Sequence, residues 1–342
     1  MNHIEVFERK FEPSGAIDYD VAIDGMPLPE LLDRNTENTI DERLSSFIKP
    51  FMTLFPAWSF DLDWEGDIRF VWDVLNMEKA PVPILMCEDD ADFSCIVVVV
   101  DVEKTKDYVY WNRIGYVNHD NESFEDEKLH GILFTEAYSD EDWEKYGDNI
   151  ALEDVDSDNW CQWISDNWEE ELYRRRMNYT LPYYRKEGSI TWFMETDWEF
   201  ARSEYEEMLD KYHVLQRIKR AEDYLKEDTG KKISGSDCAK VLSEILPNGK
   251  RILDNHYKEY NELLLHVFVC EAINEPFIKL IRSGTSSDLE IEIYKDAIKI
   301  MLLRGSEDVL NALYVSVYER LLDEKDAFES RGINIDLLIP ET

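Results

Sequence analysis

Two groups of side chains in this sequence have the types and spacing that metal sites use, and the first is an acidic run. Asp61–Asp67 places acids at its first, third and fifth positions and glycine at its sixth, as a calcium-binding loop does. Position twelve of such a loop is a bidentate Glu, and here it is Trp72. The flanking residues also have strand-like patterns. The incomplete motif therefore predicts an acidic hairpin turn rather than a calcium site.

The second group is a histidine and a cysteine one helical turn apart. His266 and Cys270 would face the same side of a helix, where both could bind a metal ion. No third or fourth ligand is evident nearby, whereas a structural zinc site takes four. Their neighbours Leu263, Val267 and Ile273 are apolar. We therefore expect a core histidine and cysteine in a helix that is buried over much of its surface, with no metal.

Motifs that carry catalysis are missing from the sequence. Gly230-Lys231-Lys232 lacks the upstream glycine and the Ser or Thr of a phosphate-binding loop. No G-x-S-x-G element occurs, and six scattered histidines give no clear base for a Ser or Cys nucleophile. Carboxylates are so abundant that a glycosidase pair has no support without geometry. We therefore expect a protein that is not an enzyme and has no catalytic residue.

The charge of the chain is strongly negative and unevenly distributed. The 342 residues include 75 acids and 37 bases, a net charge of −38. Residues 1–171 hold 43 acids and 12 bases, and residues 172–342 hold 32 and 25. Direct binding to nucleic acid or to an anionic membrane surface is disfavoured, because both require clustered Lys and Arg. The chain is not a disordered acidic tail, since 44% of its residues are hydrophobic and 13% aromatic.

The acidic surplus is greatest over residues 118–171, where 19 acids accompany only Lys128 and Lys145. A solvated face is the ordinary role of such a run, but a net charge of about 2–8 is enough to keep a small domain soluble. The excess favours a cationic partner. Trp160, Trp163 and Trp168 have two interpretations, packing of a helix face onto the sheet or, for an exposed indole, an anchor for that partner.

Compartment signals predict a soluble cytoplasmic protein. The first residues, Met1–Glu5, contain no basic segment followed by an apolar run, so they do not form a signal peptide. The longest aliphatic run, Ile96–Val100, is far shorter than the ~20 residues that span a bilayer. Five cysteines without a C-x-x-C pair suit a reducing compartment.

The elements of the first half predict an α+β domain with a mostly antiparallel sheet. Ile17–Ile23 alternates apolar residues with Asp18 and Asp20, the period of a half-buried strand, and Asp24-Gly25 marks a turn. Thr39–Glu42 fits a capping box that begins a helix carrying Phe51 on its apolar face. Further strands are expected over the ranges 83–88, 93–101, 108–116 and 189–195, the second of them central and covered on both faces.

The remaining segments predict a surface excursion followed by helices. Residues 118–156 are polar and weakly periodic, and Asp158 then begins a helix that Arg174–Arg176 close. We expect one helix shortly after residue 200 and others over the ranges 236–246, 255–282, 287–303 and 306–324. Pro276 is expected to kink the helix over 255–282, and Gly284 and Gly305 are expected to end helices. The predicted organisation is an acidic α+β domain over 1–198, a helical connector over 199–250 and an all-α domain over 251–342.

Three segments of the first half together resemble a known class of proteins. They are the I-D-G-x-x-L turn at Ile23–Leu28, the run Val82–Cys95 with the strand Ile96–Val100 after it, and the V-x-W-x-R-I-G segment Val109–Gly115. This order resembles immunity proteins of bacterial polymorphic-toxin and contact-dependent inhibition systems. Residues 256–340 resemble a helical domain of unknown function found in such loci, through His266–Glu271 and Asn311–Glu319. The resemblance implies a cytoplasmic antitoxin without catalytic residues or cofactor.

The charge and the resemblance lead to the same functional expectation. We expect an immunity protein that neutralises a cognate basic toxin domain, such as a nuclease, through an acidic surface, since opposite charges speed association and exclude wrong partners. The alternatives are a DNA mimic that inhibits a nucleic-acid-binding protein and, third, an enzyme that uses carboxylates. The expected partner-binding residues are Asp140, Glu141, Asp142, Trp143, Glu144, Asp148, Glu153, Asp154, Asp156, Asp158 and Trp160.

Overall fold

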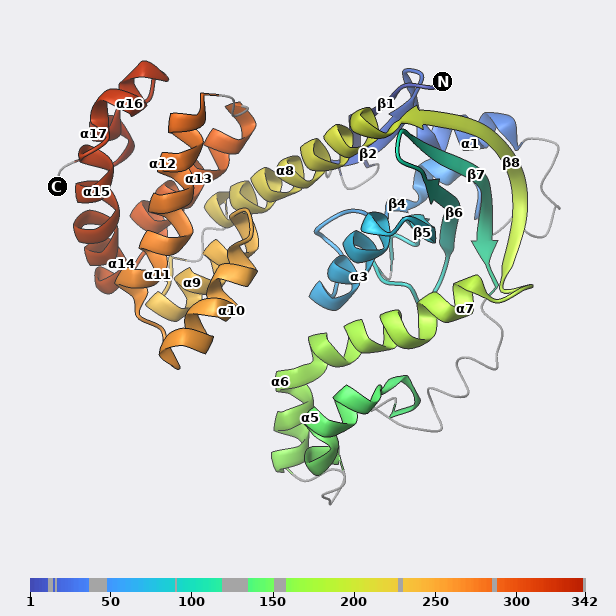
Figure 1. The fold of residues 1–342 in the computed structure, drawn as a ribbon, viewed down its shortest axis with the longest axis horizontal. Coiled ribbons are helices and arrows are strands. Elements are labelled where there is room, and N and C mark those ends of the chain that lie inside the picture. The colour runs from blue at the N-terminus through green and yellow to red at the C-terminus, as the bar shows by residue number, and fades with distance from the viewer. Residues whose placement is uncertain are drawn as a thin grey trace. The chain divides into compact units, whose positions relative to one another are not determined.

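The computed structural model describes residues 1–11, 15, 17–36, 48–89, 91–118, 135–150, 158–226, 230–284 and 288–340. The chain divides into two compact units, Met1–Leu209 and Asp210–Thr342. Unit 1 contains two antiparallel sheets with helices, and unit 2 is helical (Figure 1). The predicted class, α+β followed by an all-α part, is confirmed.

The division between the units differs from the predicted domain boundaries. The helix α8 (Arg202–Lys226) spans the point of division, and α9 (Gly235–Ile245) contributes Cys238 and Leu242 to the core of unit 2. The segment expected as a connector over 199–250 is therefore not a separate part of the fold. The apolar face of α9 explains the difference, because those side chains are buried only by packing on the helices that follow.

The first sheet of unit 1 has three strands in the order β1 (Ile4–Lys10), β2 (Ile17–Ile23) and β3 (Met26–Pro27). Asp24 and Gly25 connect the last two with positive φ angles of 52° and 78°, the geometry of a two-residue hairpin turn. The predicted strand and turn are both confirmed. Leu28 and Leu32 of α1 (Leu28–Asn35), a helix that the sequence patterns did not predict, are fully buried beside this sheet.

The burial along β2 corrects the expected alternation. Asp18 and Asp20 are buried, whereas Ile17 is exposed. Arg9 Nη1 lies 2.9 Å from Asp20 Oδ2, and Ser59 Oγ donates a hydrogen bond of 2.5 Å to Asp18 Oδ2. The two carboxylates can be buried because Arg9 and Ser59 pair with them in the interior. A period-two pattern does not reveal such partners.

The second sheet positions most of unit 1. Its five antiparallel strands lie in the order β4, β5, β6, β7 and β8. Their bounds are Phe55–Pro56, Lys79–Met86, Val97–Lys104, Tyr108–Val117 and Ile190–Ala201. Val97–Val100 are fully buried at the centre, which confirms the predicted covered strand. The last strand is longer than the predicted 189–195, because it pairs with all of β7.

Two predictions ahead of β5 change in the structure. Residues 37–47, which include most of the helix expected after Thr39, lie outside the described residues. Phe51 belongs to a separate 3₁₀ turn, η1 (Phe51–Thr53). The acidic run after Asp61 does not form a hairpin. It begins the helix α3 (Glu65–Asn76), within which Asp67 is completely buried.

The tryptophan-containing helix α6 (Asp158–Arg175) is present as predicted, but it packs mainly on another helix. A π-helical turn (Arg176–Thr180) and α7 (Leu181–Arg185) continue it. Gly66 of α3 brings the two backbones so close that a Cβ there would lie 2.6 Å from the carbonyl oxygen of Glu169. The Trp168 ring packs edge-on against Trp64, with centroids 6.0 Å apart. Contacts of Trp168 with Trp64 and of Trp163 with Tyr146, whose ring centroids lie 6.0 Å apart, therefore take the place of the expected packing on the sheet.

Unit 2 is a set of helices around one apolar core. After α9 its elements are α10 (Gly249–Tyr260), α11 (Leu265–Val269), a π-helical turn (Cys270–Asn274), α12 (Glu275–Ser283), α13 (Asp288–Arg304), α14 (Glu307–Ala312), a second π-helical turn (Leu313–Tyr318), α15 (Glu319–Leu322), α16 (Lys325–Ser330) and α17 (Ile335–Leu338). The helices expected over 287–303 and 306–324 are present, with the second interrupted by the π-helical turn.

The prediction of a single helix over 255–282 is wrong. Asn261 adopts a left-handed conformation at the end of α10, with φ 58°, and the chain enters α11 four residues later. The buried His256 supports this turn, because its Nε2 accepts a hydrogen bond of 3.0 Å from the Leu264 N–H. Gly284 ends α12 with φ 67°, as predicted. Gly305 does not adopt a left-handed φ, and a Cβ there would instead meet the Met301 carbonyl oxygen at 2.3 Å.

Candidate functional site

The acidic segment before α6 contains a helix, α5 (Asp140–Ile150), that the expected surface excursion did not include. Ser139 begins it with a reciprocal cap. Its Oγ accepts a hydrogen bond of 3.2 Å from the Asp142 N–H, while its own N–H donates to Asp142 Oδ2 at 2.9 Å. Asp140 and Glu141 in the first turn stabilise the helix dipole. The polar composition of α5 made the helix hard to predict from the sequence, because only Tyr146 among the described side chains of α5 is buried.

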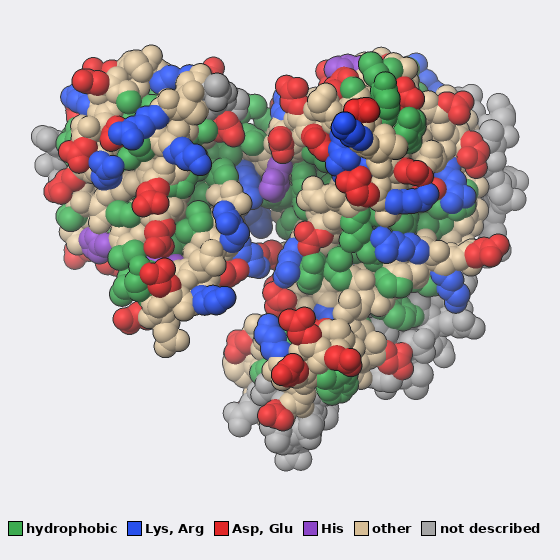
Figure 2. Space-filling view, in the orientation of Figure 1, with side chains coloured by type: hydrophobic (Ala, Val, Ile, Leu, Met, Phe, Trp, Pro, Cys, Tyr) green, Lys and Arg blue, Asp and Glu red, His purple; other side chains and the backbone are tan. Residues whose placement is uncertain are grey.

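The exposed carboxylates of α5 gather on one side of the helix. Successive residues are rotated by about 100°, so Asp140, Glu144 and Asp148 form a stripe and Glu141 lies beside it. We call these four residues the α5 acidic face. All four are exposed, and none forms an ion pair with a described residue. Figure 2 shows acidic side chains at the lower end of unit 1, where Figure 1 places α5 and α6.

An aromatic side chain borders the α5 acidic face. Trp143 is 44% exposed, and its ring lies 5.4 Å from that of Tyr138. Lys145, the one base in the sequence of α5, has its Nζ 4.5 Å from the centre of the Tyr146 ring rather than near a carboxylate. The helix thus presents unneutralised carboxylates together with an indole, the combination that a basic protein surface with an apolar recess would fit.

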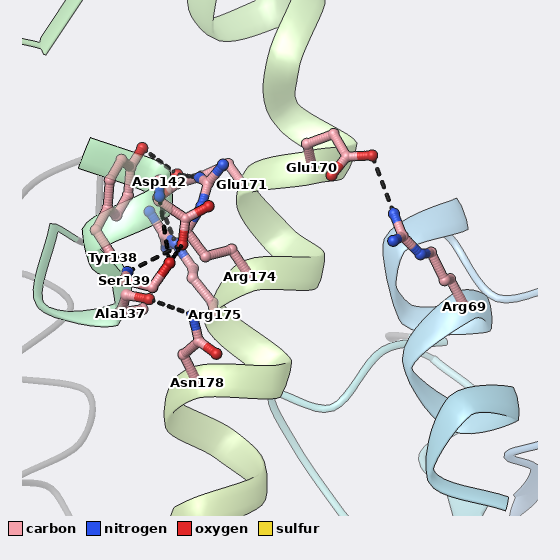
Figure 3. A network of polar contacts seen from close by, with 10 residues as sticks. All are labelled: Arg69, Ala137, Tyr138, Ser139, Asp142, Glu170, Glu171, Arg174, Arg175 and Asn178. Atoms are coloured by element: carbon pink, nitrogen blue, oxygen red, sulfur yellow. Dashed lines mark hydrogen bonds and ion pairs between the residues drawn. The ribbon is translucent and has the colours of Figure 1, made fainter. Parts of the chain in front are cut away.

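The opposite side of α5 is attached to α6 by a buried ionic network (Figure 3). Arg174 Nε lies 2.9 Å from Asp142 Oδ1, and Arg174 Nη1 donates to Glu171 Oε2 at 2.5 Å. Glu171 also accepts a hydrogen bond of 3.2 Å from Arg175 Nε and one of 2.6 Å from the Tyr138 hydroxyl. Glu171, Arg174 and Arg175 are each less than a tenth exposed. Because every charge has a partner, the network holds α5 in one position.

The environment of this network changes the acidity of its members. Partial burial alone would raise the pKa of Asp142, but hydrogen bonds from Ser139 and Arg174 bring it below the ordinary value. Burial and the hydrogen bond to Glu171 raise the pKa of the Tyr138 hydroxyl. Asp142 therefore stays ionised in its pair, and Tyr138 stays a hydrogen-bond donor.

The structure separates the predicted site residues into three groups. Asp140, Glu141, Trp143, Glu144 and Asp148 lie together on α5, and Asp158 is exposed at the first residue of α6. Asp142 points toward Arg174 and belongs to the supporting network. Glu153, Asp154 and Asp156, together with the side chain of Trp160, lie outside the described residues.

Local sequence patterns did not reveal that three arginines are structural residues. Arg174–Arg176 were assigned only a favourable place at the end of a helix, yet each makes an ion pair inside unit 1. Arg176 Nε, for example, lies 2.8 Å from Oδ1 of the buried Asp67, 109 residues earlier in the chain. The concentration of three cations after an acidic run was the one signal of this role.

The two candidate metal groups have other roles. His266 is exposed rather than in the core, and its Nδ1 lies 2.7 Å from Ser316 Oγ. Cys270 is partly buried near the Ser316 carbonyl oxygen. In the acidic run, the burial of Asp67 and its pairing with Arg176 remove one carboxylate from solvent. Within the described ranges, no three His, Cys, Asp or Glu side chains are grouped so that they could hold a metal ion.

Comparisons with protein-family models, with curated proteins and with solved structures found no match for this chain. None of the helices in the described part of the chain combines the length and the apolar character that crossing a bilayer requires. The arrangement on α5 is therefore the basis for a functional proposal.

Proposed function

We propose that this protein is an immunity protein that binds and neutralises a basic toxin domain through the α5 acidic face. The observation that carries the proposal is the contrast between the two sides of α5. One side exposes four carboxylates that form no ion pair with a described residue, and the other holds the partly buried Asp142 in a network of paired charges. Like charges so close together oppose folding, and a cationic partner would relieve that repulsion.

Electrostatics supports a fast inhibitor. A toxin must be bound before it acts, and complementary charge raises association rates by about 10–10³. Nuclease toxins suit such a surface, because a groove that holds phosphates is lined by Lys and Arg. The carboxylates of the α5 acidic face would pair with those Lys and Arg side chains in place of the phosphates.

Rigidity and an aromatic anchor support affinity. The ionic network holds α5 before the partner arrives, so little ordering remains to oppose binding. Trp143, 44% exposed at the border of the acidic face, has the residue type most enriched among hot spots. We therefore assign long-range attraction to the carboxylates and much of the short-range affinity to Trp143.

The direct test is binding to the C-terminal domain of the protein encoded by the gene immediately upstream, with growth rescue on co-expression. Asp140→Asn, Glu141→Gln, Glu144→Gln and Asp148→Asn together should lower the association rate about 10-fold or more and reduce its salt dependence. Trp143→Ala should raise the dissociation rate, at a cost of about 2 kcal/mol or more. The matched control neutralises four exposed acids of unit 2: Asp254→Asn, Glu262→Gln, Asp326→Asn and Glu329→Gln.

The outcomes separate this proposal from its alternatives. If neither binding nor rescue occurs, or if the control variant loses as much as the α5 variant, the proposed interface is wrong. A DNA mimic would bind several unrelated DNA-binding proteins, so a broad binding profile would favour that function. Binding to one basic domain, with loss confined to the α5 and Trp143 variants, would support the immunity function.

A further inference from the structure

A pocket in unit 1 has the opposite charge character from the rest of that unit. It has a cavity volume of about 710 Å³ and lies between the large sheet and the segment that leads from α7 into β8. Its lining comprises Lys79, Ala80, Pro81, Asp101, Arg113, Tyr184, Arg185, Lys186, Glu187, Ile190 and Trp192. We call this the basic pocket. Its size falls within the range of about 300–1,000 Å³ that is usual for small-molecule sites.

Cations outnumber acids around the basic pocket. Four of its lining residues are Lys or Arg and two are Asp or Glu, although residues 1–209 carry 50 acids and only 18 bases. On the view in Figure 2, Lys and Arg side chains gather over the region where Figure 1 places α7 and the sheet. Such a concentration within a very acidic unit is not expected from composition.

The cations differ in whether a carboxylate neutralises them. Arg113 Nε lies 3.0 Å from Asp101 Oδ2, and Lys79 Nζ lies 2.7 Å from Glu103 Oε2 on the neighbouring strand. Arg185 and Lys186, in contrast, form no ion pair with a described residue. The Arg185 Nη2 atom only approaches Met77 Sδ and the Lys79 carbonyl oxygen, both at 3.4 Å. Arg185 and Lys186 thus have no carboxylate partner among the described residues, although Glu187 beside them also lines the pocket.

The floor of the basic pocket is fixed by the sheet. The guanidinium of Arg113 lies 4.1 Å from the centre of the Trp192 ring, a cation–π contact. Gly115 on the neighbouring strand leaves room for Trp192, because a Cβ at position 115 would come within 2.8 Å of the Trp192 ring. The indole of β8 and two cations that form no ion pair with a described residue thus line the same pocket, where they offer an apolar wall and a charged edge.

We propose that the basic pocket binds a small organic anion, with its phosphate or carboxylate group on Arg185 and Lys186 and its apolar part against Trp192. Arg has a planar fork of donors that matches two oxygens of either group, and Lys adds a point charge. The repulsive field of distant acids is screened beyond about 8 Å at physiological salt, so the groups that line the pocket control binding. Among these groups four cations outnumber two acids, Asp101, which is paired with Arg113, and Glu187. This inference is independent of the toxin-binding surface.

Titration of the full chain with phenyl phosphate, benzoate and benzamide, followed by calorimetry and tryptophan fluorescence, tests the proposal. We expect the anions to bind and the uncharged benzamide to bind much more weakly. Comparison of phenyl phosphate with benzoate distinguishes a phosphate ligand from a carboxylate. Arg185→Gln combined with Lys186→Gln should raise the dissociation constant about tenfold or more. Both residues are exposed, so the variant should fold normally.

The control is Lys10→Gln combined with Lys106→Gln, which removes two other exposed cations of unit 1 and should leave binding unchanged. Trp192→Leu, which keeps an apolar wall but loses the indole, should weaken anion binding less than the double charge variant. The proposal is overturned if neither anion binds, if benzamide binds as well as benzoate, or if the control pair weakens binding as much as the change at Arg185 and Lys186.

Discussion

Arg174 of α6 and Asp142 of α5 form an ion pair with a separation of 2.9 Å between Nε and Oδ1. Arg174 is 6% exposed, so the pair is largely removed from water. The same guanidinium lies 4.2 Å from the Tyr138 ring centre and 4.7 Å from that of Tyr146. One arginine thus holds the helix that carries the α5 acidic face.

Replacing Arg174 with Met should therefore loosen α5. Removal of one partner from a buried ionic network costs about 3–5 kcal/mol, because Asp142 and Glu171 lose a buried counter-charge. Hydrogen exchange should report faster exchange at α5 amides, and denaturant unfolding should report the lower stability. Arg34→Met is the control: it removes an exposed ion pair with Glu30 and should change stability by less than about 1 kcal/mol. Unchanged α5 exchange in the Arg174 variant would contradict the anchoring role.

Arg9→Met should destabilise unit 1 strongly. Arg9 is paired with the buried Asp20, and its loss leaves that carboxylate without compensation, again at about 3–5 kcal/mol. Adding Asp20→Asn to the Arg9→Met variant should restore part of the lost stability, because an amide carries no charge. A double-mutant cycle from urea unfolding measures the coupling, and simple additivity would argue against the pair as a unit.

The same pair predicts a pH effect. Burial raises the pKa of Asp20 to about 6 against the opposing effect of Arg9. The folded state therefore holds this proton more tightly than the unfolded state, so the destabilisation by ionised Asp20 is fully present above about pH 6 and is relieved as the pH falls toward 4. Without Arg9 the pKa of Asp20 rises further, so the stability deficit of Arg9→Met should shrink as the pH falls toward about 6 and stay constant below it, where the wild type gains the same proton. A deficit that does not change as the pH falls from above neutral to about 6 would show that Asp20 does not titrate there.

His213 should make unit 2 sensitive to acid. Burial, together with the charge of Arg217, lowers the pKa of His213 to about 3, against about 6.5 in an unfolded chain. The unfolded state then binds more protons between these values, so stability is fully present above about pH 6.5 and is lost as the pH falls toward 3. His213→Gln should reduce the loss by about 1–2 kcal/mol, a discounted value because the side chain is partly exposed.

The measurement for His213 is urea unfolding at several pH values, compared between wild type and variant. The control replaces the exposed His3 with Gln, a change that leaves His213 and its surroundings as they are. Parallel profiles for wild type and His213→Gln would mean that this imidazole takes no part in acid unfolding.

Two helical glycines should respond in opposite directions to replacement by alanine. A Cβ at Gly66 would meet backbone atoms of α6 at 2.6 and 3.1 Å, so Gly66→Ala should cost about 1–3 kcal/mol. At Gly147 of α5 the Cβ meets only the Trp143 ring at 3.6 Å, and alanine should stabilise the helix by up to about 1 kcal/mol. Thermal and urea unfolding distinguish the two signs. A tolerated Gly66→Ala would show that α3 and α6 can move apart.

Several elements of the fold followed from local patterns in the sequence. Val97–Val100 predicted a covered central strand because a continuous β-branched run suits burial on both faces. Asp24-Gly25 predicted a turn because both residues tolerate positive φ. Within the candidate site, the same local patterns identified the acids and Trp143 by composition but missed the helix that arranges them, since few residues of α5 are apolar.

The sequence by itself determined the surplus of carboxylates, four of the five strands of the large sheet and the helical character of the second half, because composition and short-range periodicity carry that information. Tertiary structure decided which charges are buried. Asp67 meets Arg176 across 109 residues, Asp18 meets Ser59 across 41, and the basic pocket is lined by four strands, the helix α7 and the loop after it. A charge can remain inside only where distant segments supply its partner, and no local pattern records which segments will meet.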